Sequence, residues 1–318
     1  MCLFVLSSSM AIVAKAAPLD AFLKLLLQSY SHDSNAQPLL MTNLTKMAAT
    51  LSPPHQSDAY VRLAELSSRP NVSGVAHNLY VVAHSLYVLG YHADSNSIEA
   101  LYGMCATIPR SKDRDENLRM VGRWTALDAT NALPHYLKAI LLAERKDCKR
   151  ALEEVRRGNA LGVAQHRPLY LRIFQTGQLR VTEEERTRAR EEFFLRQMTL
   201  GSRLTVGYMA LRECAKATSD GDLISTLRDL VVMQDTIGLA EPVLPTTFIR
   251  SSILAIETIE SACQLEEGLT SEGEVKAQLM SYAKSRRELL DTACERETSE
   301  WNSEYVARLR DALRLARP

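Results

Sequence analysis

Turn-forming residues are scarce in this chain, and their scarcity limits the folds that it can adopt. The 318 residues include only 13 glycines and 11 prolines, while Ala, Leu, Glu and Arg are abundant. A many-stranded β fold needs a tight turn after each short strand, and this composition supplies few of them. Strong helix formers need fewer such breaks. The sequence therefore predicts an all-α fold of one or two domains.

Acidic and basic residues balance, with 38 Lys and Arg against 38 Asp and Glu. The basic residues are interleaved with acids, as in residues 186–192 (RTRAREE). A nucleic-acid-binding surface normally has a basic excess or a continuous basic stripe. The charge pattern indicates solvated helix faces instead, so we expect no nucleic-acid partner.

The N-terminus allows two interpretations. Residues 3–13 form an apolar run that is too short to span a membrane comfortably, and Ala14-Lys15-Ala16 has the pattern of a signal-peptidase site. No Lys or Arg precedes the run, which favours an ordinary apolar helix. If residues 1–16 are a signal peptide, the protein is exported to the periplasm or secreted; otherwise it is cytoplasmic. No integral membrane span is expected beyond such a signal or anchor.

The six cysteines are dispersed, and no two form a CxxC pair. This spacing predicts neither a disulfide framework nor a zinc ribbon, and most of the six are expected to be small buried side chains. Cys148 differs because it lies beside Lys149 and Arg150 near a helix start, an environment that lowers a thiol pKa. We interpret it as a partly exposed cysteine in a turn. The set is Cys2, Cys105, Cys148, Cys214, Cys263 and Cys294.

The middle of the chain has the pattern of two helical hairpins. Helices are predicted over 74–90 and 95–107, with Gly90 as the C-cap of the first, and over 133–145 and 147–157. A lone helix is expected over 113–127 between the two pairs. This pattern divides the chain into residues 1–16, N-terminal helices over 17–71, the hairpins over 72–165, and a C-terminal helical region over 166–318.

The hairpins place small residues where two helices must approach closely. Ala83, Ala139, Ala151 and Gly158 occupy such positions. On these residues, segments 76–109 and 132–161 resemble tetratricopeptide repeats, a family of paired antiparallel helices. Lys138 departs from the pattern, which calls for a large apolar residue there. The resemblance implies antiparallel hairpins stacked in an α-α superhelix or solenoid with additional flanking helices, and it implies binding of a protein or peptide partner.

The resemblance also suggests which residues would face a partner. His77, Tyr80, His84 and Tyr87 are spaced three, four and three apart, so they share one helix face. Tyr136 is on the matching stripe of the second hairpin. Rings with polar tips suit a binding groove. The alternative is that the N-terminal helices cover this stripe, which would then be plain core.

The sequence carries no recognisable catalytic or cofactor motif. His77 and His84 would lie about 10 Å apart along a helix, too far for one zinc ion to bind both. No catalytic, cofactor-binding or metal-binding residue is therefore predicted. The favoured function is a non-enzymatic scaffold that binds a protein or peptide. The alternatives are an enzyme with its site in the C-terminal helical half, and an exported or anchored accessory protein.

Overall fold

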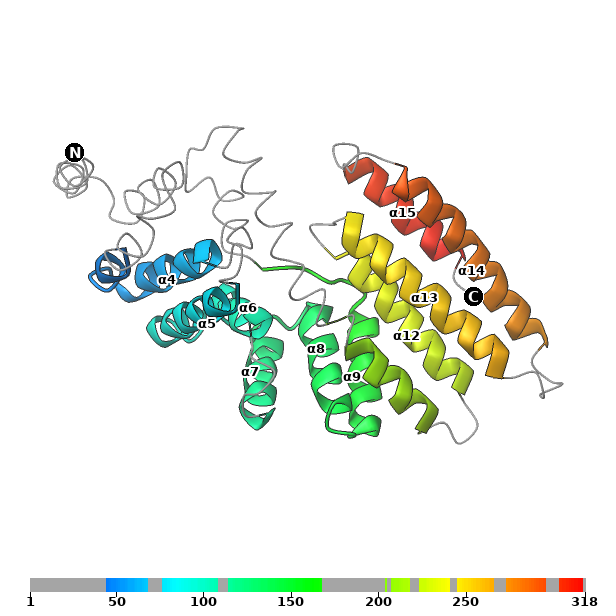
Figure 1. Ribbon diagram of the computed structural model, residues 1–318, viewed down its shortest axis with the longest axis horizontal. Coiled ribbons are helices and arrows are strands. Elements are labelled where there is room, and N and C mark those ends of the chain that lie inside the picture. The colour runs from blue at the N-terminus through cyan, green and yellow to red at the C-terminus, as the bar shows by residue number, and fades with distance from the viewer. Residues whose placement is uncertain are drawn as a thin grey trace. The chain divides into compact units, whose positions relative to one another are not determined.

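The computed structural model confirms the all-α prediction (Figure 1). Of the described residues, 85% are helical and none forms a strand. None of the helices in this part of the chain is long and apolar enough to cross a membrane. Residues 1–16, for which a signal peptide was considered, lie outside the description. The structure describes residues 44–67, 76–107, 114–167, 204, 207–217, 223–240, 245–265, 273–295 and 303–316.

The chain forms two compact units, and the division between them lies between the two predicted hairpins. Unit 1 contains α4 (Pro53–Ser67), α5 (Ala76–Ala93) and α6 (Ile98–Thr107). The two prolines that open α4 occupy its first turn, where a missing N–H leaves no helical hydrogen bond unmade. Apolar residues of all three helices form one buried cluster, which includes Leu63, Ala83 and Ala100.

Gly90 does not end its helix, as the sequence suggested, because α5 continues for three more residues to Ala93. It is buried against α4 instead. A Cβ atom at Gly90 would lie 3.1 Å from Val61 Cγ2 and 3.3 Å from the backbone oxygen of Ser57. The absence of a side chain therefore permits close packing of α5 on α4, and a packing requirement rather than a turn explains this glycine.

Unit 2 contains the described helices from α7 onward, several of which follow one another side by side in Figure 1. The helices predicted over 113–127, 133–145 and 147–157 are present with boundaries shifted by a few residues. The described helices of unit 2 are α7 (Arg114–Leu127), α8 (Ala132–Ala143), α9 (Cys148–Leu161), a helix over 207–217, α12 (Leu223–Gly238), α13 (Pro245–Leu265), α14 (Gly273–Cys294) and α15 (Ser303–Ala316).

The second predicted hairpin, α8 with α9, is anchored by Asn131. Its side-chain oxygen accepts hydrogen bonds from the backbone N–H groups of Leu133 and Gln165, at 3.1 and 2.9 Å. Its amide donates to Asp128 Oδ2 and to the carbonyl of Gln165, at 2.8 and 2.7 Å. One N-cap residue thus accepts a hydrogen bond from a free backbone N–H in the first turn of α8. It also holds the chain segment that follows α9 next to the start of α8.

Gly158 lies inside α9, where it receives the ring of Tyr136 from α8. A Cβ atom at this position would lie 2.4 Å from Tyr136 Cε1, closer than van der Waals contact allows. A small residue is therefore needed at this position because an aromatic ring lies against it, and not because the helix ends there. The helix ends later, at Gly162, whose φ of 67° is the left-handed conformation typical of a C-terminal cap.

Helices of unit 2 pack on their neighbours and also on the next described helix but one. Ile140 of α8 lies against Gly207, and Asn159 of α9 donates to the carbonyl of Asp229 in α12 at 2.9 Å. Contacts of the same kind, between helices separated by one other described helix along the chain, join helix 207–217 to α13, α12 to α14, and α13 to α15. Those three contacts are Tyr208 with Thr258, Tyr282 with Asp235, and Phe248 with Tyr305, Leu309 and Leu313.

The structure corrects the interpretation of the cysteines. Cys148, the first residue of α9, is bonded to Cys214 in helix 207–217, and their Cα atoms lie 4.9 Å apart. The two are 66 positions apart in sequence, so spacing rules for short motifs could not pair them. Of the other described cysteines, Cys105 is buried, as expected, and Cys294 is exposed.

We expect Gly158→Ala to destabilise the protein. The added methyl would push the buried ring of Tyr136 out of its seat, and such overpacking costs about 1–3 kcal/mol. Gly122→Ala in α7 is the matched control, because a Cβ there meets nothing within 4 Å. That change should stabilise by about 0.5–1 kcal/mol through helix propensity. Chemical denaturation of both variants measures the difference, and equal shifts would contradict the packing argument.

Candidate functional site

The predicted ring stripe on α5 is described at two of its four positions. His84 and Tyr87 are each 7% exposed. The side chains of His77 and Tyr80 lie outside the described residues. At these two positions the rings are buried within unit 1.

Both rings pack toward α6, the second helix of the same hairpin. The ring of Tyr87 occupies the place of a Cβ at Gly103, with Cε1 2.0 Å from that position. His84 Nδ1 lies 3.1 Å from Thr107 Oγ1, and the Thr107 hydroxyl donates to the carbonyl of Gly103 at 2.8 Å. Because a hydroxyl has one proton to give, His84 Nδ1 carries the proton in this hydrogen bond.

Tyr136, the predicted site residue of the second hairpin, is completely buried. Its ring rests on Gly158, and its hydroxyl donates to Asn159 Oδ1 at 3.0 Å. Asn159 in turn donates to the carbonyl of Asp229 in α12. The polar tip of Tyr136 is thus satisfied inside the unit, and the residue connects three helices.

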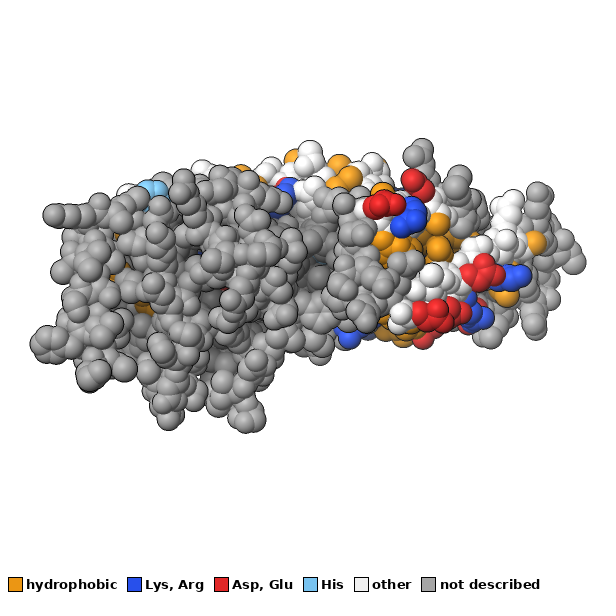
Figure 2. Space-filling view, turned by 90° about the horizontal axis from the view of Figure 1, so that it is seen from above, with side chains coloured by type: hydrophobic (Ala, Val, Ile, Leu, Met, Phe, Trp, Pro, Cys, Tyr) orange, Lys and Arg blue, Asp and Glu red, His pale blue; other side chains and the backbone are white. Residues whose placement is uncertain are grey.

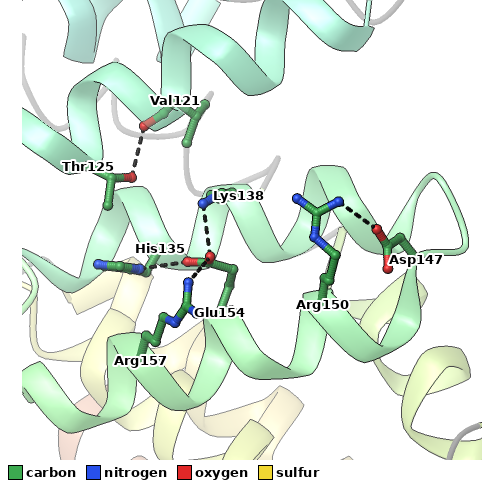
Figure 3. Close-up of polar contacts among 8 residues, drawn as sticks. All are labelled: Val121, Thr125, His135, Lys138, Asp147, Arg150, Glu154 and Arg157. Carbon is green, nitrogen blue, oxygen red and sulfur yellow. Dashed lines mark hydrogen bonds and ion pairs between the residues drawn. The ribbon is translucent and has the colours of Figure 1, made fainter.

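A charged cluster around Glu154 joins α8 to α9, and sequence analysis missed it (Figure 3). Glu154 is 4% exposed. Its Oε2 atom lies 2.8 Å from His135 Nδ1, and its Oε1 atom accepts from Lys138 Nζ at 2.9 Å and Arg157 Nη1 at 2.7 Å. Lys138, which broke the repeat pattern, is explained here because its ammonium group pairs with a carboxylate of the opposite helix. The signal available in the sequence was that unexpected lysine.

The electrostatics of Glu154 follow from this environment. Burial disfavours the carboxylate and would raise its pKa, but hydrogen bonds from His135 and Lys138, with the charges of both, outweigh it. The pKa falls from 4.5 to about 2. The carboxylate is therefore ionised at neutral pH and saturated with donors, so it stabilises the hairpin and is poorly suited to accept a proton in catalysis.

A second polar cluster lies deeper in unit 2, between α12 and α14. Tyr282 donates to Asp235 Oδ2 at 2.6 Å, and Arg286 donates to the Tyr282 hydroxyl at 2.7 Å and forms an ion pair with Asp235. Arg286 and Asp235 are both fully buried. A buried acid and base that neutralise one another fix the register of their helices, because removal of either leaves an unpaired charge inside the protein.

Tyr208 and Thr258 extend the polar interior to helix 207–217 and α13. The Thr258 hydroxyl donates to the carbonyl of Leu254 at 2.7 Å, so the Tyr208 hydroxyl, 2.7 Å from Thr258 Oγ1, is the donor in their bond. Burial raises the pKa of Tyr208 to about 12. The phenol therefore stays protonated and acts as a hydrogen-bond donor between the two helices.

Neither polar cluster has the composition of a metal centre. Within the described part of the chain, no three His, Cys, Asp or Glu side chains are grouped so that they could hold a metal ion. The two clusters pair their charges internally, which suits helix pairing better than chemistry on a substrate.

The exposed surface of unit 2 offers a different kind of site. Met209 is 50% exposed on helix 207–217, and Ile253 is 42% exposed on α13. Each has charged neighbours on its own exposed stripe, at spacings of three and four residues. We give the name Met209–Ile253 face to the exposed stripes of these two helices taken together, which comprise Met209, Glu213, Lys216, Arg250, Ile253 and Glu257. The sequence analysis named none of its members, because an exposed apolar residue cannot be told from a core residue by periodicity alone.

Comparison with known proteins provides no relative for these features: no family model, curated protein or solved structure matches the chain.

Tyr87→Ala should lower the free energy of unfolding by about 3 kcal/mol, because it removes a buried ring from its seat on Gly103. Tyr91→Ala, four residues further along α5 at a partly exposed position, should have a smaller effect. Thermal and chemical unfolding of the two variants test this. A stable Tyr87→Ala protein would restore the interpretation of the stripe as an open groove.

Glu154→Gln should destabilise the protein by about 1–3 kcal/mol near neutral pH, because it removes a charged acceptor from three donors, of which His135 and Lys138 are partly buried. The lowered pKa fixes the pH dependence. The stabilisation is present above pH 4.5 and is lost as the pH falls toward about 2. Denaturation of the variant and wild type between pH 7 and 2 should therefore show converging stabilities.

Glu153→Gln on the same helix is the control for the Glu154 variant. Glu153 is partly exposed, and its substitution should change stability by less than about 0.5 kcal/mol at any pH in that range. A constant difference between Glu154→Gln and wild type across the range would contradict the assignment of Glu154 as the ionised centre.

Proposed function

We propose that this protein is a non-enzymatic scaffold of tetratricopeptide-like helical repeats, and that it binds a protein or peptide partner through the Met209–Ile253 face. The observation that carries the proposal is the packing of unit 2, in which the described helices from α8 to α15 contact the next described helix but one along the chain. Stacked hairpins pack in this manner, and they present rows of helices to solvent.

The packing sorts helices of unit 2 into two layers. Helix 207–217 and α13 belong to one layer, since Tyr208 contacts Thr258, while α12 and α14 belong to the other. In α13, Ala255 and Ile259 pack against Val231 of α12 and Tyr282 of α14. Helical periodicity places Ile253 on the side of α13 away from that contact. Helix 207–217 repeats the arrangement, with Leu211 and Ala215 buried and Met209 exposed.

The chemistry of the Met209–Ile253 face suits a peptide or protein. Two exposed apolar side chains stand among two acids and two bases, so the face has no net charge. Exposed hydrophobic side chains set among acidic and basic ones are a general feature of the side of the molecule drawn in Figure 2. Methionine adapts its shape to a partner, and apolar anchors ringed by charged residues are typical of interfaces. The expected partner offers apolar side chains flanked by charges of both signs.

This proposal moves the binding surface away from the predicted ring stripe. His84, Tyr87 and Tyr136 have their polar groups and rings engaged inside their hairpins. Binding through them would require the hairpins to open, whereas the Met209–Ile253 face is available in the folded chain.

The alternative function, an enzyme with its site in residues 166–318, has less support. The most polar group of side chains described in that region is the cluster of Asp235, Tyr282 and Arg286. These groups are fully or almost fully buried and bonded to one another, which leaves a substrate no approach to them. The scaffold proposal is therefore favoured.

The double variant Met209→Glu/Ile253→Glu should lose its partner without loss of fold. New charges at exposed positions disturb an apolar contact with a partner but bury nothing in the free protein. Quantitative affinity capture from extract of the source cells, with the full chain as bait, would compare the proteins retained by the variant and by wild type. Circular dichroism and the melting temperature would verify the fold.

Met280→Glu is the matched control, because Met280 is 45% exposed but belongs to α14 in the other layer. We expect it to retain every protein that wild type captures. Equal loss in both variants, or no change in the double variant, would reject the Met209–Ile253 face as the binding surface.

A further inference from the structure

The bond between Cys148 and Cys214 joins sulfurs in unlike environments. Cys148 begins α9 and is partly exposed, whereas Cys214 is 3% exposed on helix 207–217. A thiolate that attacks a disulfide must reach one sulfur along the line of the S–S bond. The difference in burial makes Cys148 the sulfur that a dissolved thiol can reach, with Cys214 as the leaving group.

The surroundings of Cys148 favour a sulfur anion and attract other anions. The residue is in the first turn of α9, where unpaired backbone N–H groups carry partial positive charge. Lys146, Lys149 and Arg150 are exposed around it, and Arg150 lies 3.2 Å from Asp147 in an ion pair. Such an environment favours the thiolate form at neutral pH, which makes Cys148 a good leaving group when a second thiol attacks its mixed disulfide.

The charge balance around the bond remains positive when acids are included. On the α9 side, Glu144, Asp147 and Asp115, which forms an ion pair with Arg145, oppose Arg145, Lys146, Lys149 and Arg150. On the side of helix 207–217, Glu213 beside Cys214 is paired with Lys216 at 2.9 Å, and Arg212 is also near in sequence. A small anionic thiol is therefore attracted to the site relative to a cationic one.

We propose that Cys148 and Cys214 form a thiol–disulfide exchange site for small anionic thiols, with Cys148 as the sulfur attacked. The site regulates the attachment of α9 to helix 207–217, the helix that carries Met209 of the proposed binding face. The inference does not depend on that face, because it rests on the cysteine pair and its charged surroundings alone.

The reaction balances without a metal or cofactor. The thiolate of the small thiol attacks Cys148 Sγ, the bond to Cys214 breaks, and the Cys214 thiolate takes a proton from water. A second small thiolate attacks the sulfur of the first, which releases Cys148 and one molecule of small disulfide. Two small thiols are oxidised and one protein disulfide is reduced, with two protons bound by the new protein thiols. Oxidation of the protein is the reverse, with the small disulfide as oxidant.

The consequence of reduction is a looser unit 2. The bond crosslinks positions that are 66 residues apart, and such a crosslink stabilises chiefly by limiting the unfolded chain. Reduction should therefore lower the melting temperature of the full chain by about 5–10 °C. The variants Cys148→Ser and Cys214→Ser should melt near the reduced protein and should not respond to a reductant.

Site assignment is tested first, with glutathione and its disulfide as probes on the full chain. Peptide mapping of the oxidised protein should recover the Cys148–Cys214 crosslink. In Cys214→Ser, glutathione disulfide should label Cys148 quickly, whereas in folded Cys148→Ser it should leave the buried Cys214 unlabelled. Absence of the crosslinked peptide, or labelling of Cys214 at the rate of Cys148, would overturn the proposal.

Charge selectivity is tested by the rate of reduction with 3-mercaptopropionate, an anionic thiol, and with cysteamine, a cationic one, each corrected for its thiolate fraction. We expect the anionic thiol to react several-fold faster with wild type at low ionic strength. The double variant Lys146→Gln/Lys149→Gln should reduce this ratio toward one, and Arg308→Gln on α15 should leave it unchanged. A ratio that is the same in wild type and the double variant would reject the anionic-thiol assignment.

Discussion

The close approach of paired helices depends on an aromatic ring that rests on a glycine. In the first hairpin Tyr87 of α5 covers Gly103 of α6, and in the second Tyr136 of α8 covers Gly158 of α9. In both cases the first helix of the hairpin contributes the ring, and the second contributes the glycine, whose missing side chain leaves a gap for it. Any side chain in that gap would push the helices apart, and the polar contacts across the hairpins would then lose their geometry.

Charges hidden between the helices give the packing its specificity. Apolar side chains allow helices to slide along one another at little cost, whereas a buried ion pair is satisfied in one register only. Glu154 serves α8 and α9 in this way, and Asp235 with Arg286 serves α12 and α14. Because these pairs bring opposite charges into direct contact between helices, they contribute to the structure of unit 2.

The proposed binding face and the proposed exchange site share a helix but face different ways. Met209 and Cys214 are five residues apart on helix 207–217, which separates them by about 140° around the axis. A partner on the Met209–Ile253 face would therefore leave the disulfide open to a thiol. Any coupling between the two would pass through the position of the helix itself, since the disulfide attaches it to α9.

The sequence by itself determined the helices of this protein. Scarce glycine and proline and the small residues at positions such as Gly158 are local signals, and local signals decide where a helix forms and where it can be approached. A local sequence signal gave a wrong interpretation where the residue is small because of a contact with a helix distant in sequence. Gly90 resembled a helix end, but its partner is α4. The sequence left open whether the rings of Tyr87 and Tyr136 face a groove or the core, and in the structure they lie against glycines of the following helix.

Only the tertiary structure decided which residues meet. Lys138 was an anomaly until Glu154 was placed beside it, Cys148 had no partner within reach of any motif, and Met209 and Ile253 could have been core. Burial, ion pairing and crosslinking depend on contacts between residues tens of positions apart. A helical pattern gives the face on which a side chain lies, but the identity of the neighbour on that face is a property of the folded chain.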